Sequence, residues 1–133
     1  MTGERASRSS WLALIAEDDR DIRELVATKL TGAGYRVIAV GDGTAALNAI
    51  REQSPDIALL DVMMPGLSGL DVIGKLRTDE RTAAVPVILL SAKSQDFDVQ
   101  TGISSGAVDY IIKPFSPREL LERVENVLKR TRG

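Results

Sequence analysis

The sequence predicts an α/β fold in which five parallel strands form one sheet covered by helices on both faces. Short apolar runs alternate with stretches of helical periodicity five times along the chain, which is typical of right-handed crossovers around a parallel sheet. The runs are almost continuously apolar, as expected for strands that are buried on both faces. A length of 133 residues with 44% apolar content suits one domain with a single core.

The first two strands are expected at Leu12–Ala16 and Arg36–Val40. Between them, apolar residues at helical spacing predict a helix over 22–30, closed by Gly32 and Gly34. Together these segments form the first strand–helix–strand unit of the sheet.

The middle of the chain repeats this pattern. A helix from Asp42 or Gly43 to residue 53 is followed by a strand at Ile57–Asp61 and by a helix over 68–78. The helix over 68–78 begins with a serine that can cap it, directly after a proline–glycine turn.

The last part of the chain adds two strands and two helices. The strands are expected at Val87–Ser91 and Asp109–Lys113, with a helix over 95–106 between them. That helix has the weakest pattern of the five, because it contains a glycine and several serines. The final helix opens with a serine and a proline and carries a clear apolar stripe over 120–128.

The two ends of the chain differ from the middle. Residues 1–10 are polar and lack hydrophobic periodicity, so they predict a disordered leader. The last residues are basic and equally aperiodic. We therefore expect the folded domain over 11–130 and a short tail over 131–133.

Composition excludes several classes of protein. The chain contains no cysteine and no histidine, so it has neither disulfides nor thiolate zinc sites and cannot itself carry a phosphohistidine. The net charge is -2 and there is no long basic run, which argues against direct nucleic-acid binding by this chain. The apolar run over 11–16 is too short for a membrane span or a signal peptide, so we expect a cytoplasmic protein without membrane contact.

Polar residues close four of the five expected strands. Ligands bind outside the carboxyl ends of the strands in an open parallel sheet, so we expect the chemistry of this protein at these positions. With the strand order 2-1-3-4-5, the acidic groups that close the first and third strands would face each other. The closing residues are Glu17, Asp18 and Asp19 after the first strand, Asp61 after the third, Ser91 after the fourth and Lys113 after the fifth.

Carboxylates gathered at one edge of the sheet need a countercharge. Three carboxylates about 5 Å apart would repel by about 3 kcal/mol per pair at an effective dielectric constant near 20. Lys113 supplies one positive charge, and a divalent cation would supply two. The candidate ligands are all oxygens, which favours a hard ion that also keeps waters, and we expect Mg²⁺.

Each closing residue also has a purely structural explanation. Asp19 fits the N-cap of the following helix at least as well as a metal site. Ser91 could cap a helix, and Lys113 could be solvated in an ordinary turn. Asp61 differs from these, because it precedes a proline–glycine turn and has no nearby helix start to cap. The joint pattern therefore favours a functional site.

Four motifs strongly resemble the receiver domain of two-component response regulators. They are LIAEDD, LLDVMMPGLSG, VILLSAK and DYIIKPFSPREL, in this order, and four fragments in register are far more specific than one. The resemblance covers residues 11–130 and implies a flavodoxin-like, doubly wound five-stranded sheet with five helices. The spacings agree with the family too, with 44 residues from Glu17 to Asp61, 30 from Asp61 to Ser91 and 22 from Ser91 to Lys113.

The resemblance implies a role for each closing residue. Asp61 would accept a phosphoryl group from the phosphohistidine of a histidine kinase or a phosphotransfer protein, and Ser91 and Lys113 would contact the phosphoryl oxygens. The chain would then be a regulatory phosphoacceptor rather than an enzyme, catalysing only its own phosphoryl transfer and slow autodephosphorylation. The Mg²⁺ ligands that the resemblance implies are Glu17, Asp18, Asp61 and the backbone carbonyl of Met63.

The resemblance also implies a switch. Movement of Ser91 toward the new phosphate would turn Tyr110 inward and change the face formed by 95–106, 109–113 and the final helix. From the residues alone, an ordinary half-buried strand tyrosine is an equally good interpretation of Tyr110. We expect the changed face to control an output domain or a downstream effector protein.

The final strand and helix resemble receivers of the winged-helix transcription-factor branch, which form homodimers by pairing this face through charged residues. Val99 and Val108 stand where those receivers usually carry a basic residue and an aspartate, so some ion pairs of such a homodimer would be lost. Four residues do fit the charged pattern, namely Asp109, Glu119, Arg123 and Arg130.

Two further positions bear on the lifetime of the phosphorylated state. Met63 and Lys93 lie where the family tunes dephosphorylation. Because a methionine side chain cannot orient an attacking water, we expect a comparatively long-lived phosphorylated form.

Two other functions fit parts of the sequence. Gly41, Gly43 and Ala46 form a G-x-G-x-x-A pattern after a strand, and Asp61 closes the next strand at a spacing typical of dinucleotide sites. A nucleotide-binding sensor module is therefore the alternative hypothesis. A phosphatase with an aspartyl nucleophile is disfavoured, because Met63 stands where a general acid would be needed.

Overall fold

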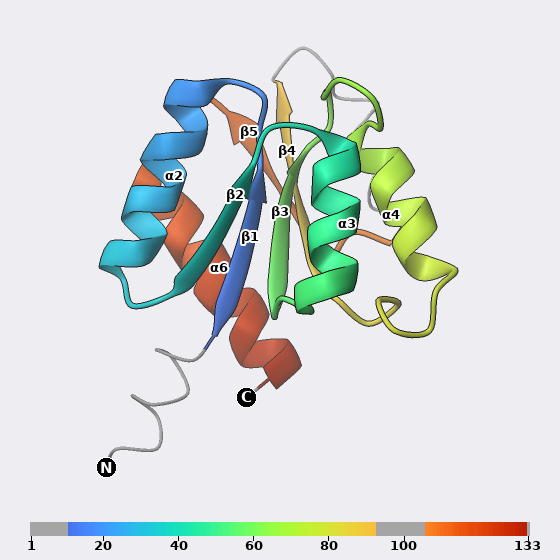
Figure 1. Ribbon diagram of the computed structural model, residues 1–133. Coiled ribbons are helices and arrows are strands. Elements are labelled where there is room, and N and C mark those ends of the chain that lie inside the picture. The colour runs from blue at the N-terminus through green and yellow to red at the C-terminus, as the bar shows by residue number, and fades with distance from the viewer. Residues whose placement is uncertain (1–10, 93–105, 133) are drawn as a thin grey trace.

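Five parallel strands form one sheet in the computed structural model, which describes residues 11–92 and 106–132 (Figure 1). The strand order is β2-β1-β3-β4-β5, as the sequence predicted. Each strand is parallel to its neighbours. The strands are β1 (Leu12–Ala16), β2 (Arg36–Val40), β3 (Ile57–Asp61), β4 (Val87–Ala92) and β5 (Asp109–Lys113).

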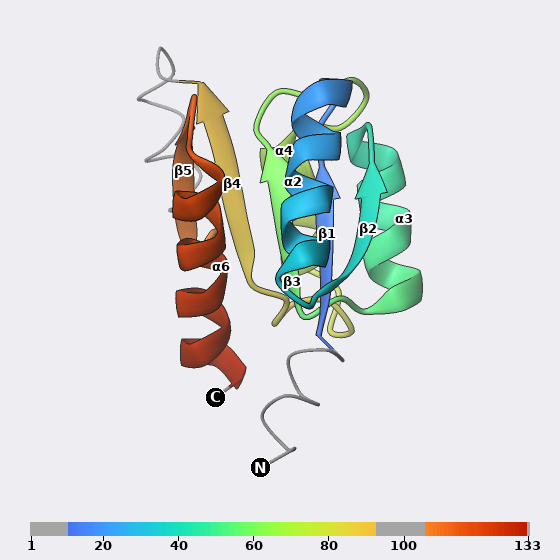
Figure 2. The same cartoon turned by 90° about the vertical axis from the view of Figure 1, so that its left-hand side faces the viewer.

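Four helices lie within the described residues, two on each face of the sheet (Figures 1 and 2). The fifth helix expected over 95–106 falls outside the described residues except for its last position. None of the described helices is both long and apolar enough to cross a lipid bilayer. The helices are α2 (Arg20–Gly32), α3 (Gly43–Gln53), α4 (Gly69–Arg77) and α6 (Pro117–Arg132).

The two faces of the sheet carry separate apolar clusters. Alternate residues of β1 divide between them, so that Leu14 joins the cluster under α3 and α4, and Ile15 joins the cluster under α2 and α6. In β3, Leu60 and Leu59 divide in the same way. All four side chains are completely buried, which explains why the central strands are continuous apolar runs in the sequence.

Short polar side chains begin three of the helices. Asp19 accepts a hydrogen bond from a first-turn amide of α2, and Asp42 does the same for α3. Ser68 and Asp71 form a reciprocal capping box at α4. The structural explanation weighed for Asp19 is therefore confirmed.

The observed element ends differ slightly from those expected. Strand β4 extends one residue further, to Ala92, and α6 continues to Arg132, which includes two residues of the expected tail. Differences of this size are usual at element ends, where the last turns and pairs are weakly defined.

Candidate functional site

The carboxyl ends of β1, β3 and β5 lie at the same edge of the sheet (Figure 1). Side chains from these three ends meet there. Asp61 is the last residue of β3, and Lys113 is the last residue of β5. Glu17 follows β1 directly, and its amide donates a hydrogen bond to the carbonyl of Val40 on β2 (3.1 Å). Glu17 and Asp61 are buried, with exposures of 0% and 5%, so two carboxylates lie in the protein interior.

Lys113 joins the two buried carboxylates. Its Nζ atom lies 2.7 Å from Oε1 of Glu17 and 3.0 Å from Oδ2 of Asp61. Neighbouring strands are about 4.8 Å apart, so the lysine side chain reaches across the sheet edge from β5 to residues of β3 and β1. One ammonium therefore offsets two buried negative charges.

The electrostatic balance at this edge remains negative. Burial raises the pKa of Glu17 above its ordinary value and the Asp61 carboxylate adds to the rise, while Lys113 opposes it without cancelling it. For Lys113 itself, burial acts to lower the pKa, but the two carboxylates outweigh burial and the pKa is raised. The site therefore favours additional positive charge.

A third carboxylate stands beside this pair. Oxygen atoms of Glu17, Asp18 and Asp61 lie within 4.8 Å of one another. Asp18 is exposed, so the cluster is open to solvent on one side. Asp19 is used differently, because its side chain caps α2. Three carboxylates at an open edge can hold a hard divalent cation that also keeps waters.

The two oxygens of Glu17 test whether a cation fits this cluster. Oε2 accepts a hydrogen bond from the amide of Asp19 (3.1 Å). Oε1 is fully buried and has no hydrogen bond of good geometry within the described residues, although the ammonium of Lys113 contacts it. A buried carboxylate oxygen with an incomplete set of partners is costly, and a Mg²⁺ ion would complete it. The residues therefore fit the ion that the sequence predicts.

The loop after β3 contributes Met63. Its amide donates a hydrogen bond to Oδ1 of Asp61 (3.3 Å), while Lys113 donates to Oδ2. Both carboxylate oxygens of Asp61 are thus held by the protein. Met63 as a whole residue is 59% exposed beside the site. Metal binding by its backbone carbonyl stays a prediction.

Ser91 and Tyr110 share one face of the sheet on adjacent strands. Ser91 is buried on β4, and by alternation with Leu89 it faces the side of α3 and α4. Its hydroxyl donates to the carbonyl of Ala92 (3.3 Å). Tyr110 is half-buried, packs against the same apolar cluster and is the register partner of Leu89. This arrangement is compatible with the expected switch, which stays a prediction.

Arg23 is a site residue that the sequence pattern did not reveal. From α2, its Nη1 atom donates a hydrogen bond to the backbone carbonyl of Glu17 (2.8 Å). A Cβ added at Gly41 would lie 3.0 Å from the same atom, so this glycine leaves room for the guanidinium. Arg23 therefore fixes the backbone that carries Glu17 and Asp18.

Comparison with known proteins identifies the fold and its family. Residues 13–125 match the family described as the response regulator receiver domain. The chain belongs to this family. The receiver resemblance of the four sequence motifs is thereby confirmed.

The curated relatives of this receiver are longer proteins. The DNA-binding response regulator MtrA of Mycobacterium tuberculosis is 46% identical over 117 residues, which cover 88% of this chain and 50% of that protein. The phosphate regulon transcriptional regulatory protein PhoB of Pseudomonas aeruginosa is 43% identical over 118 residues, which cover 89% of this chain and 52% of that protein. The receiver thus spans about half the length of these relatives.

Solved structures match the receiver over nearly its whole length. A response regulator from Chloroflexus aurantiacus has a TM-score of 0.86 and 35% identity, with 90% of this chain and 98% of that chain covered. The receiver domain of the Francisella response regulator 1452 has a TM-score of 0.85 and 36% identity, with coverages of 92% and 100%.

The glycine pattern that suggested a nucleotide site has another explanation in this receiver. Ala46 is buried in the core, and a Cβ on Gly43 would lie 1.9 Å from the carbonyl oxygen of Leu67. The amide of Gly43 donates to the carbonyl of Pro65 (3.4 Å), and Asp42 caps the helix. Protein groups therefore occupy the helix N-terminus that would have to bind a pyrophosphate, so these contacts do not favour the nucleotide hypothesis.

Charged residues of β5 and α6 pair within the receiver. Arg123 donates hydrogen bonds to Oδ1 of Asp109 (2.8 Å) and to the carbonyl of Tyr110 (3.0 Å). It also contacts Oε2 of Glu119 at 3.5 Å. Val99 lies outside the described residues. All these contacts lie within one chain and do not test the expected homodimer. A homodimer through this face stays a prediction.

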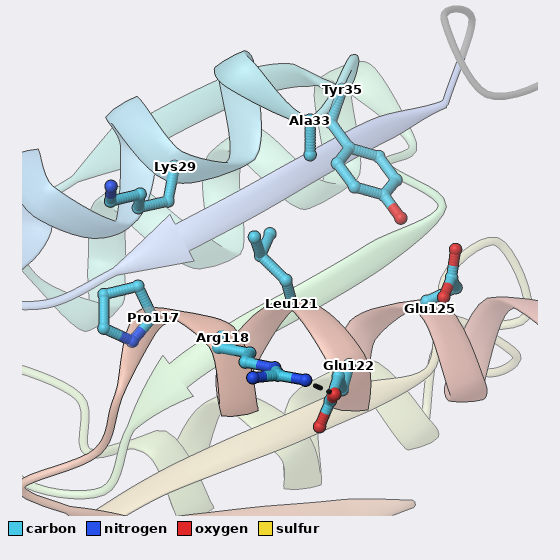
Figure 3. A pocket seen from close by; sticks show the side chains of 8 residues that line it. All are labelled: Lys29, Ala33, Tyr35, Pro117, Arg118, Leu121, Glu122 and Glu125. Carbon is cyan, nitrogen blue, oxygen red and sulfur yellow. Dashed lines mark ion pairs between the residues drawn. The ribbon is translucent and has the colours of Figure 1, made fainter.

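A pocket of about 350 Å³ lies between α2 and α6, away from the acidic edge (Figure 3). Leu121 points toward Ala33 and Tyr35, and Arg118 pairs with Glu122 at 3.6 Å along α6. The residues that line the pocket include none of the carboxylates of the acidic cluster. The pocket therefore belongs to the helical face and not to the chemistry of the strand ends.

Proposed function

We propose that this receiver is a phosphorylation-activated signalling switch in which Asp61 is the phosphoacceptor. The observation that carries the proposal is the contact of Lys113 with Oδ2 of Asp61 (3.0 Å) inside a cluster that includes Glu17 and Asp18. Burying a carboxylate at a strand end is costly. A nucleophile flanked by an ammonium and a cation site accounts for that cost, because all three groups are needed for phosphoryl transfer.

The phosphoryl donor must lie outside the residues of this sequence. The 133 residues contain no histidine, so we propose that the phosphohistidine is supplied by a histidine kinase or a phosphotransfer protein. In the proposed reaction, an oxygen of Asp61 forms a bond to phosphorus as the phosphorus–nitrogen bond of the donor breaks. The imidazole leaves with the electron pair, and Asp61 becomes an aspartyl phosphate. In this proposal the receiver is a regulatory phosphoacceptor, which catalyses only its own phosphoryl transfer and slow autodephosphorylation.

The protein's contribution to this transfer is positioning and neutralisation of charge. Lys113 contacts the carboxylate that attacks and is placed to contact the transferred oxygens as well. Ser91 is the second group proposed to contact those oxygens. Mg²⁺, when held by Glu17, Asp18, Asp61 and the carbonyl of Met63, would neutralise further negative charge on the phosphoryl group.

The proposed switch links Ser91 to Tyr110. A phosphate on Asp61 would give the Ser91 hydroxyl a strong acceptor, in place of its 3.3 Å contact with the Ala92 carbonyl. Movement of Ser91 would open space on the face that it shares with Tyr110, and the tyrosine would turn further inward. Phosphorylation would thereby bias an existing equilibrium of the β5–α6 face.

The partners proposed for this receiver follow from its family. They are a kinase or phosphotransfer protein upstream, an output domain or effector protein downstream, and a second copy of the chain in a homodimer through the switch face. We place the receiver in the cytoplasm, with no membrane contact and no direct nucleic-acid contact by this chain.

Labelling with acetyl phosphate and Mg²⁺ tests the proposal. Intact mass should show the gain of one phosphoryl group, and chelation of Mg²⁺ should prevent it. Asp61→Asn should remain unlabelled, whereas Glu80→Gln, at an exposed carboxylate, should be labelled like the wild type. Labelling of Asp61→Asn at the wild-type rate would show that another residue is the acceptor.

Two further measurements complete the test. Slow autodephosphorylation is proposed because the exposed thioether of Met63 cannot orient an attacking water, and loss of the label within seconds in Mg²⁺ would refute it. Titration with NAD separates the receiver function from the nucleotide hypothesis. Saturable NAD binding without any labelling would favour the nucleotide-binding sensor.

A further inference from the structure

The loop over 62–68 directly follows Asp61 and runs past the N-terminus of α3 (Figure 1). The amide of Gly43, the first residue of α3, donates to the carbonyl of Pro65 (3.4 Å). Gly66 has a φ of 77°, and a Cβ there would lie 3.3 Å from Oγ1 of Thr44. The loop therefore lies close against the first residues of α3.

Gly43 makes the tightest of these contacts. A Cβ at this position would lie 1.9 Å from the carbonyl oxygen of Leu67, 2.7 Å from its carbonyl carbon and 2.8 Å from its Cβ. Carbon atoms in contact are normally about 3.5–4.0 Å apart, and backbone atoms cannot rotate away as a flexible side chain can. Gly43 has no positive φ, so close approach and not turn geometry explains this glycine.

Gly69 holds the other end of the same loop. A Cβ there would lie 2.5 Å from the carbonyl oxygen of Asp61, and the amide of Gly69 donates to the carbonyl of Val62 (2.9 Å). Met63 lies between these fixed points, with its amide on Oδ1 of Asp61. The backbone on both sides of the proposed metal ligand is thus set by contacts that only glycine permits.

We infer that Gly43 and Gly69, which fix the loop over 62–68 by close contact, are positioning residues for Mg²⁺ binding and phosphoryl transfer at Asp61. The inference rests on the function proposed for that site. Alanine at position 43 would force the Leu67 carbonyl away from α3 and would displace the loop that carries Met63. Helix propensity alone predicts that Gly43→Ala stabilises α3, since alanine is a better helix former than glycine.

The test compares Gly43→Ala with Gly74→Ala. Gly74 is an exposed position inside α4, and a Cβ there meets no atom within 4 Å. Calorimetric titration measures the Mg²⁺ dissociation constant, and acetyl phosphate labelling is followed over a range of Mg²⁺ concentrations. Gly43→Ala should weaken Mg²⁺ binding about fivefold or more, which corresponds to about 1 kcal/mol. The Mg²⁺ concentration for half-maximal labelling should rise by the same factor, while Gly74→Ala should match the wild type.

A merely structural role for Gly43 gives a different result. If Gly43→Ala lowers the melting temperature but leaves Mg²⁺ binding equal to that of Gly74→Ala, the inference is overturned. If Gly43→Ala does not fold, Gly69→Ala carries the same test, since the overlap at that position is smaller. Its expected and overturning results are the same.

Failure of the proposed function would be distinguishable. A wild type that binds Mg²⁺ but is never labelled at Asp61 contradicts the proposed function, and the Mg²⁺ affinities of the variants still decide the inference. A wild type that binds no Mg²⁺ overturns both.

Discussion

The ammonium nitrogen of Lys113 lies 2.7 Å from Oε1 of Glu17, although β3 and β4 separate their two strands in the sheet. The same ammonium also contacts Asp61, which ends the intervening strand β3. The lysine thus spans the carboxyl edge and serves as the countercharge for both buried carboxylates. A second cation bound at this edge would also offset the charge of these carboxylates. The free energy of unfolding should therefore depend on whether that cation is bound.

Replacing Lys113 should therefore destabilise the metal-free protein. Removing one partner of a fully buried ion pair costs about 3–5 kcal/mol. Because the Lys113 side chain is 21% exposed, we expect a smaller loss for Lys113→Ala, about 2 kcal/mol in the free energy of unfolding. Urea denaturation in the presence of EDTA measures it.

Mg²⁺ should recover part of this loss, because it neutralises the same carboxylates. Lys75→Ala is the control, since Lys75 is exposed on α4 and should change stability much less. Equal effects of the two substitutions would show that the contacts of Lys113 do not stabilise the fold.

Glu17 should make the metal-free protein less stable as the pH rises. Burial raises the pKa of Glu17 in the folded state, so the folded state binds more protons than the unfolded state between the ordinary and the raised pKa. In that window, the free energy of unfolding falls as the pH increases. Glu17→Gln removes this titration, so the variant should gain stability relative to the wild type from pH 4.5 upward.

Paired urea titrations of wild type and Glu17→Gln across this pH range, in EDTA, measure the difference. With Mg²⁺ added at neutral pH, the wild type should have the higher free energy of unfolding, because only the wild type has the full ligand set. A constant difference between the two proteins at all pH values would contradict the raised pKa.

The sequence was sufficient to predict which side chains meet at the edge. Glu17, Asp61 and Lys113 each follow a short apolar run, and parallel topology brings the carboxyl ends of strands together. The decisive signal was the joint pattern of polar residues that close four of the five apolar runs, because carboxylates gathered at one edge need a countercharge.

Other contacts depend on geometry that no local pattern encodes. The hydrogen bond from Arg23 to the Glu17 carbonyl depends on how α2 packs beside β1. The contact of Gly43 with Leu67 depends on the path of the loop after β3, and in sequence the same glycine resembled a phosphate-binding pattern. Tertiary packing, and not local propensity, determined both.

Asp18 and Asp19 should separate metal binding from stability. Asp18 is an exposed member of the carboxylate cluster, whereas Asp19 accepts the capping hydrogen bond of α2. Asp18→Asn should leave metal-free stability unchanged but weaken the response to Mg²⁺. Wild type should gain about 1.4 kcal/mol at a Mg²⁺ concentration ten times its dissociation constant.

Asp19→Ala should show the opposite behaviour. Loss of an N-cap costs about 1 kcal/mol of stability, and the response to Mg²⁺ should remain because the cluster keeps its three carboxylates. Thermal unfolding with and without Mg²⁺ measures both effects. A full Mg²⁺ response in Asp18→Asn would remove Asp18 from the ligand set.

Arg77 should prove to be a structural anchor of the side of the domain opposite the acidic edge. Its Nη1 atom donates to the carbonyls of Ala83 and Val85, both at 2.9 Å, and Nη2 donates to the carbonyl of Gly106 at 2.8 Å. Burial lowers the pKa of Arg77. A Cβ on Gly106 would lie 2.9 Å from Nε, so this glycine gives the guanidinium its place.

Arg77→Lys keeps the charge but loses the planar fork that reaches three carbonyls at once. We expect a loss of about 1–3 kcal/mol in the free energy of unfolding, since the part-buried carbonyls of Val85 and Gly106 are left without these donors. Arg81→Lys is the control, because Arg81 is exposed and its side chain pairs with nearby Asp79 (3.1 Å). Urea denaturation should show no comparable change for Arg81→Lys. Equal stability of the two variants would mean that a lysine at position 77 satisfies the same carbonyls, or that water reaches them.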